Sequence, residues 1–475
     1  MKNRALPTLL ALVLPVLSWP AAAQTAARVD DLRYPPLREV KIPQPERVVL
    51  DNGLVVLLLE DHELPLVDAT ALVRIGSRLD PAGKAGLAEL GASVLRAGGT
   101  ERMPSDQLDL WLESRAASIE AHAARDQGRV TLSALAQDFP EVLRVFADVL
   151  RRPAFDAARL EVVRNQSVAG VARQNDDPDE ILFREFGELV YGPDSPYASQ
   201  ETLASLRALR REDLVQWHRQ SFHPDRIVLG LVGDFRKEEA LRLVREAFGD
   251  WPRGPKAPLP ELPYRTRPNP GVFWVEKNDM AQSALLLGHL GIRKDDPDFY
   301  AVEVLNYVLS GSFAARLINE VRNRKGLAYS VQGGVDSQWD HPGLAYFYAS
   351  TKTATTGAGI QALLDEARGL RTRPPTQEEV EKARQGLLAR FVFNVDSKRE
   401  VLEQQLGFEL FGYPADWLAR YRAGLEAVTV EQVRAAAVRH LRPEELSILV
   451  VGPAEGRDRP LTDFGKVTNV DITIE

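Results

Sequence analysis

The sequence predicts an α+β protein made of two homologous domains. A helical stretch, a proline turn and an apolar strand that ends in glycine fill residues 212–233 and recur in residues 431–452, at a constant offset of 219. Between the two copies, residues 252–271 hold seven of the 31 prolines, and such a segment favours an extended linker. The repeat and the linker together predict one domain over residues 46–251 and a second over residues 272–455.

The composition is that of an ordinary globular protein, with 44% hydrophobic and 27% charged residues. Lys and Arg total 59 against 67 Asp and Glu, a net charge of −8. This balance lacks the basic footprint of a nucleic-acid-binding protein, so we expect no nucleic-acid partner. Cysteine is absent, which excludes disulfides, thiolate metal sites and a cysteine nucleophile.

The first 23 residues have the features of a signal peptide. A short basic start with Lys2 and Arg4 precedes a leucine-rich apolar run, and Ala21-Ala22-Ala23 offers small residues for cleavage. The run is shorter than the roughly 20 apolar residues that a membrane span needs. We therefore expect an exported, periplasmic protein without a membrane span, in which residues 24–45 form a polar lead-in.

Local signals predict the elements of the first domain in order. Two apolar runs flank Asn52-Gly53, and this dipeptide is typical of a tight β-hairpin turn. Residues 66–75 form a further predicted strand, and helical spacing begins near residue 85. The Asp-Asp-Pro runs at 176–178 and 295–297 are each expected to open a helix, with Asp as the N-cap. After the second domain, residues 456–475 are expected to form a C-terminal tail.

The residues alone show no complete catalytic constellation. None of the seven histidines belongs to a His-x-x-Glu-His pair, and neither a Gly-x-Ser-x-Gly elbow nor a Walker phosphate loop is present. His218 and His223 lie five residues apart before a proline, which favours the end of a helix over a metal site.

Several motifs in the first domain resemble those of the M16 (pitrilysin/insulinase) metallopeptidases. They are Asn52-Gly53-Leu54, the run from Arg74 to Asp80 with Gly-Ser-Arg, the stretch from Gly83 to Ser93, and Gly98-Gly99-Thr100. The resemblance extends over about Val48–Gly452. It implies half of a clamshell, in which each of the two homologous domains is a mainly antiparallel sheet packed with helices.

The sequence departs from the family where active members carry the zinc motif His-x-x-Glu-His. Here the three motif positions hold Glu89, Ala92 and Ser93, which helical spacing places in one arc apart from the core-facing residues. The family's third ligand is a Glu that would fall near residue 170, yet the only acid in residues 160–174 is Glu161. We expect no metal on this chain and no activity from it alone. The simpler reading of Glu89 is a solvated helix residue.

The second domain retains a pair of residues that the resemblance associates with substrate binding. In M16 enzymes an Arg and a Tyr seven residues apart bind the substrate carbonyl and stabilise the developing oxyanion, and Arg322 and Tyr329 have this spacing. A helix that ends before Lys325-Gly326, followed by a strand, would let the two side chains converge. Alternatively, Arg322 complements a helix C-terminus and Tyr329 packs between layers.

This combination is similar to the companion subunit of two-chain bacterial M16 peptidases. The resemblance implies a heterodimer or larger assembly with a zinc-bearing M16 subunit, which would hold the zinc and cleave unfolded peptide bound as an added strand. A second reading is a catalytically inactive peptide-binding or scaffold protein. A third is a peptidase with an unrecognised metal site, which the loss of every ligand disfavours.

Overall fold

The computed structural model describes residues 42–255 and 260–474, and Ile42–Glu475 form one compact unit. The predicted signal peptide and residues 24–41 of the lead-in lie outside the described residues. In the described part of the chain, no helix is long and apolar enough to cross a membrane.

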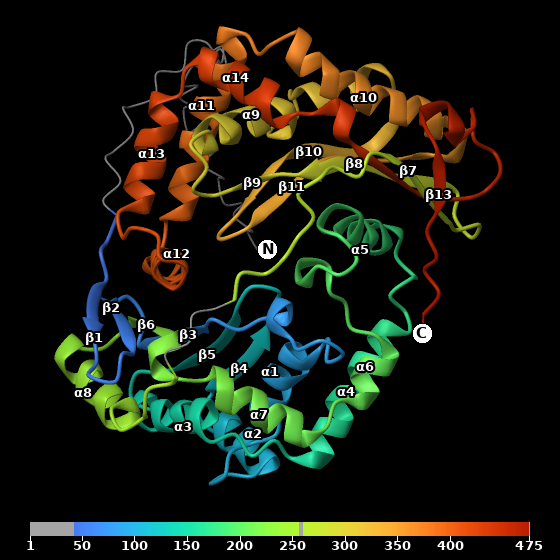
Figure 1. Cartoon of the computed structure of the whole chain (residues 1–475). Helices are drawn as coiled ribbons and strands as arrows, with labels where there is room; N and C mark the ends of the chain where they lie inside the picture. Colours follow the sequence, from blue (N-terminus) through green and yellow to red (C-terminus); the bar gives the residue numbers. More distant parts are fainter. Residues whose placement is uncertain (1–41, 256–259, 475) are drawn as a thin grey trace, which may run out of the picture. The chain divides into compact units, whose positions relative to one another are not determined.

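The strands form two sheets (Figure 1). The six-stranded sheet has the order β1-β2-β6-β3-β5-β4, and the seven-stranded sheet has the order β13-β7-β12-β8-β11-β10-β9. All neighbours in the first sheet are antiparallel except β2 and β6; in the second, the three central pairings from β12 to β10 are antiparallel. The strands are β1 (Glu46–Val49), β2 (Val55–Glu60), β3 (Leu66–Val73), β4 (Ser118–Ala123), β5 (Gly128–Leu135), β6 (Ile227–Gly233), β7 (Gly271–Glu276), β8 (Gln282–Leu290), β9 (Ile292–Arg293), β10 (Ala328–Gln338), β11 (Pro342–Lys352), β12 (Ser447–Gly452) and β13 (Val467–Asn469).

Helices pack on both sheets. They are α1 (Leu87–Ala97), α2 (Ser105–Glu113), α3 (Phe139–Arg151), α4 (Ala157–Val171), α5 (Pro178–Tyr191), α6 (Leu203–Ala208), α7 (Arg211–Ser221), α8 (Lys237–Phe248), α9 (Phe299–Ser310), α10 (Thr356–Thr372), α11 (Gln377–Phe391), α12 (Lys398–Phe411), α13 (Trp417–Ala427) and α14 (Val430–His440).

The sheet topology confirms the internal duplication. The order β2-β6-β3-β5-β4 in the first half has the same chain order and the same strand directions as β7-β12-β8-β11-β10 in the second half. Helices α7 and α14, which precede the repeated strands β6 and β12, begin at Arg211 and Val430, 219 residues apart. The α+β fold of two homologous halves is therefore as predicted.

One helix of each half packs on the sheet of the other half, and the two helices are equivalent in the repeat. Helix α5 of the first half packs on the seven-stranded sheet, where Phe186 joins Leu286 and Leu449 in one apolar cluster. Helix α12 of the second half packs on the six-stranded sheet, where Leu406 joins Leu57. The two helices begin at Pro178 and Lys398, 220 residues apart. This reciprocal packing explains why both halves belong to one compact unit, although each sheet also has a core of its own.

Most local predictions hold, with small differences at element ends. Gly53 has φ +89° in the turn between β1 and β2, as an Asn-Gly hairpin requires. Asp177 caps α5 with its side chain, whereas α9 begins at Phe299, two residues after the second Asp-Asp-Pro run. The segment predicted as a tail contributes β13, which extends the seven-stranded sheet beside β7.

Candidate functional site

Helix α1, which carries the degenerate zinc motif, is held tightly in the first half. It lies against β4, α4 and α7. The predicted core-facing positions of α1 are buried, among them Leu90 and Val94. A Cβ on Gly91 would come within 2.8 Å of the Trp217 ring, so this glycine allows α1 to approach α7 closely.

The three motif positions do not form a metal site. Glu89 and Ser93 are partly exposed, but Ala92 is only 3% exposed and belongs to the core. Of the three positions that helical spacing placed in one arc, two are therefore partly exposed. The third is buried because the neighbouring elements cover the small side chain of Ala92. The hydroxyl of Ser93 donates to the carbonyl of Glu89 at 2.9 Å. Glu89 is therefore the one motif position that can offer a metal ligand, whereas a catalytic zinc ion needs three.

Glu89 instead faces a second carboxyl group, that of Glu201, just before α6. The two groups are close enough to share a hydrogen bond when one is protonated, and burial together with the charge of Glu89 raises the pKa of Glu201 to about 7. Asp80, which accepts hydrogen bonds from the backbone N–H groups of Gly86 and Ala88 at 3.0 Å, caps α1 beside this pair. Burial raises the pKa of Asp80 to about 7 despite those bonds.

Nothing in the described residues replaces the missing third ligand. Glu161 lies on α4, its side chain is 60% exposed and it pairs with Arg164 of the same helix. The described residues contain two groups of three potential metal ligands, and neither includes a residue of α1. The residues present therefore do not fit a catalytic zinc ion.

The raised pKa of Glu201 predicts a stability that falls as the pH rises. The unfolded carboxyl ionises near its ordinary value of 4.5, whereas the folded one resists ionisation until about pH 7, so stability is lost across this window. We expect Glu201→Gln to be more stable than wild type at pH 8 by about 1–2 kcal/mol, after allowance for solvent screening, and to gain little at pH 5. Thermal unfolding between pH 5 and 8, with the exposed Glu113→Gln as control, measures this; an unchanged pH profile in Glu201→Gln would contradict it.

Arg322 and Tyr329 do converge. Arg322 lies in a π-helical segment, Ile318–Arg324, which ends before Gly326 at φ +62°. The chain then turns into β10, and the Arg322 guanidinium lies 5.0 Å from the centroid of the Tyr329 ring. A π-helical turn is rare and is often found at functional sites.

Tyr329 does not pack between layers of the fold, which was the alternative reading of this residue. Tyr329 is 82% exposed. It lies at a break in the register between β10 and β11, where Ala328 pairs with Thr351 and Ser330 with Ser350. A bulge of this kind re-aims a side chain out of the regular ladder. Among the described residues, none accepts a hydrogen bond from the Arg322 guanidinium or the Tyr329 hydroxyl. Both groups are therefore free to donate to a ligand.

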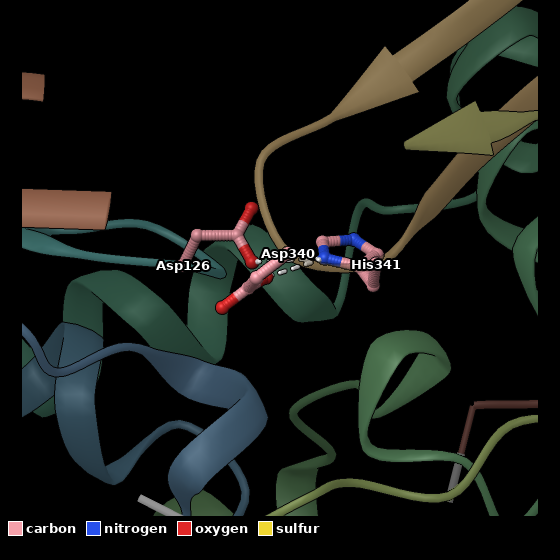
Figure 2. A group of neighbouring side chains, drawn as sticks. All are labelled: Asp126, Asp340 and His341. Carbon is pink, nitrogen blue, oxygen red and sulfur yellow. Dashed lines mark hydrogen bonds and ion pairs between the residues drawn. The ribbon is translucent and has the colours of Figure 1, made fainter. Parts of the chain in front are cut away.

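A second polar cluster joins the two halves at Asp340 (Figure 2). Arg78 donates two hydrogen bonds of 2.8 Å to the Asp340 carboxylate, and Arg74 donates a third at 2.9 Å. His341 bonds to the same carboxylate at 3.0 Å, and Asp126 pairs with Arg78 at 3.2 Å. Burial would raise the pKa of Asp340, but the bonds from His341 and Arg78 and the charges of both arginines hold it well below its ordinary value.

This cluster does not suit a metal ion, although Asp126, Asp340 and His341 could supply three ligand atoms. The guanidinium of Arg78, whose side chain is only 4% exposed, pairs with both carboxylates, and Arg74 supplies a second positive charge at Asp340. In the other group, Asp296, Asp298 and His440, both Arg439 and His440 already pair with Asp298. In both groups the ion pairs already use carboxylate oxygens that a metal ion would need.

The sequence did not indicate Glu201 or Asp340. Arg78 and Asp340 are 262 residues apart, and no local pattern marks either acid as a partner. The repeated topology, which brings the two halves together, is the only signal that could have suggested contacts of this range.

Comparison with known protein families gives two matches along the chain. Residues 55–192 match the family model described as Insulinase (Peptidase family M16). Residues 208–387 match the model described as Peptidase M16 inactive domain. Together the two matches cover more than half of the chain.

Individual proteins show the same similarity. The chain is 23% identical to the non-peptidase homolog YmxG of Helicobacter pylori over 83% of this chain and 91% of that one. It is 26% identical to the uncharacterized zinc protease YmxG of Bacillus subtilis over 66% of this chain and 75% of that one. A crystal structure of a peptidase M16 inactive domain from Pseudomonas fluorescens superposes with a TM-score of 0.79 at 25% identity, covering 87% of this chain and 99% of that one. With its duplicated fold and its lost zinc motif, the chain belongs to the M16 (insulinase) peptidase family as an inactive homologue.

Proposed function

We propose that this chain is the non-zinc subunit of a heteromeric periplasmic M16 peptidase. It supplies Arg322 and Tyr329 to substrate bound at a zinc-bearing partner subunit. The observation that carries the proposal is the pairing of an unbonded guanidinium with an unbonded, exposed phenol in a chain that has lost its own metal ligands. Such donors stabilise negative charge that develops on a carbonyl oxygen.

The sheet edges support a role in holding extended peptide. Among the described strands, β10 pairs with β9 only at Ser337 and Gln338, so none of them covers the outer edge of the first part of β10, where Tyr329 lies. The equivalent strand of the first half, β4, pairs only with β5 and lies beside α1. A free edge can bind a peptide as an added strand through main-chain hydrogen bonds.

The second candidate is a catalytically inactive peptide-binding or scaffold protein. It is favoured by the name of the Helicobacter pylori relative, which is described as a non-peptidase homolog. The free donors of Arg322 and Tyr329 favour the first candidate, because a scaffold has no need of them.

We expect the purified mature chain, residues 24–475, to hold no stoichiometric zinc. Glu89 is the only carboxylate or imidazole at the three motif positions, so the site lacks the three ligands of a catalytic zinc ion. Elemental analysis should find far less than one zinc per chain, unchanged in Glu89→Ala. About one zinc per chain, lost in Glu89→Ala, would refute the assignment.

The assembly is tested by mixing the chain with a partner. The probe is an M16 chain that carries His-x-x-Glu-His and is encoded next to this one. Size-exclusion chromatography with light scattering should show a complex larger than either chain, with zinc only in the partner. If the two chains elute separately at micromolar concentration, the heteromeric proposal fails and the scaffold reading takes its place.

A further inference from the structure

A cavity of about 470 Å³ lies where the two halves meet, apart from the sheet edge that carries Tyr329. The first half contributes residues of β3 and β5. The second half contributes residues of α9, α12 and α13, together with Lys294 directly after β9 and Trp339 directly after β10. Tyr329 lies at the other end of β10, about 30 Å away along the strand. The cavity is thus separate from the Arg322 and Tyr329 pair.

One cation in the cavity has no direct counter-ion. The Lys294 ammonium lies 4.4 Å from the centroid of the Trp339 ring and 5.8 Å from that of Phe299. No described residue accepts a hydrogen bond from it or pairs with it directly. Burial lowers the pKa of Lys294, against the more distant charges of Glu303 and Asp336. A largely buried ammonium without a direct counter-ion would be stabilised by an anion that binds in the cavity.

The other charged groups that line the cavity already form ion pairs or hydrogen bonds within the chain. Arg129 pairs with Glu403, which also accepts a hydrogen bond of 2.7 Å from Thr70. Glu303 accepts a hydrogen bond of 2.9 Å from the hydroxyl of Tyr421 through one oxygen, and burial raises its pKa. Lys294 is therefore the cation left for a ligand.

The walls are suited to a flat apolar group. Trp339 and Phe408 lie with ring centroids 5.9 Å apart at 66°, and Phe408 and Trp417 lie 6.3 Å apart. All three rings line the cavity. Aromatic surfaces of this kind favour edge and stacking contacts with a further ring.

We propose that this cavity binds a small carboxylate that carries an aromatic group, with the carboxylate on Lys294 and the ring against Trp339, Phe408 and Trp417. The class includes N-acylated aromatic amino acids and the aromatic C-terminal residue of a short peptide. The proposal does not depend on the function of Arg322 and Tyr329.

Isothermal titration of the mature chain with two matched probes tests this site. The probes are N-acetyl-L-phenylalanine and its uncharged amide, which differ only in the carboxylate. We expect the acid to bind at one site and the amide to bind at least about tenfold more weakly, since the amide carbonyl can still accept a hydrogen bond from Lys294 but lacks the negative charge of the carboxylate. Lys294→Met should weaken binding of the acid by a similar factor, whereas Lys294→Arg should largely retain it.

The control variant is Lys352→Met at the exposed end of β11, outside the cavity lining. It should bind the acid like wild type, and thermal unfolding shows that each variant is folded. Equal affinity for acid and amide, undiminished binding by Lys294→Met, or no saturable binding of the acid at millimolar concentration would overturn the proposal.

Discussion

Arg322→Ala and Tyr329→Phe should each lower the kcat of the reconstituted peptidase by roughly 10²–10³-fold, the usual cost of removing one oxyanion donor. The two groups make no hydrogen bond within the described chain, and Tyr329 is 82% exposed. Either change therefore removes a donor without opening a core cavity. Peptide cleavage by the mixed subunits measures the loss, and KM should change less than kcat because the donors act on charge that develops in the transition state.

Arg324→Ala is the matched control for the arginine. Arg324 lies two residues from Arg322 in the same π-helical segment, its side chain is 73% exposed and it pairs with Glu320. This variant should leave kcat within about twofold of wild type, while size-exclusion chromatography confirms that all variants form the complex. Full activity in both Arg322→Ala and Tyr329→Phe, with the complex intact, would remove the catalytic role and favour the scaffold reading.

Asp340→Asn should destabilise the chain by about 3 kcal/mol at pH 7, because it leaves the buried Arg78 guanidinium without its main counter-charge. The pKa of Asp340 is held below the ordinary value of 3.8. Its contribution to stability is therefore present above that pH and is lost as the pH falls through the folded pKa. Urea unfolding at pH 7 measures the cost, and the difference between wild type and variant should shrink in acid.

Glu409→Gln provides the comparison. Arg47 and Glu409 also join the first half to the second, with two hydrogen bonds of 2.8 Å, but their side chains are 48% and 25% exposed. An exposed pair of this kind contributes about 0–1 kcal/mol. If Asp340→Asn costs no more than Glu409→Gln, then the ion pairs of Asp340 with Arg78 and Arg74 do not anchor the two halves.

The parts of the fold that could be predicted depend on short-range patterns. The Asn52-Gly53 turn requires a conformation that glycine accepts. The repeat was visible because its helix, turn and strand have the same lengths in both halves. The convergence of Arg322 and Tyr329 could be expected because the two residues are only seven apart in the sequence and are separated by one helix end and one turn.

The rest depends on contacts that a linear pattern does not specify. Helical spacing shows that α5 and α12 have an apolar face, but not that each is covered by the sheet of the other half. The same limit applies to Ala92, which helical spacing grouped with Glu89 and which neighbouring elements cover. The contact between Glu89 and Glu201 and the cavity around Lys294 are likewise formed by segments far apart in the sequence, so only the folded chain reveals them.

The central claim is that this chain contributes to proteolysis only in combination with a zinc-bearing M16 subunit. The most direct measurement is the cleavage rate of an unfolded peptide by this chain alone, by the partner alone and by an equimolar mixture. We expect no cleavage by this chain alone and a rate for the mixture far above the sum of the separate rates. Two results would contradict the proposed role of this chain. One is a mixture that cleaves no faster than the partner alone, and the other is cleavage by this chain without the partner in a buffer that contains no chelator.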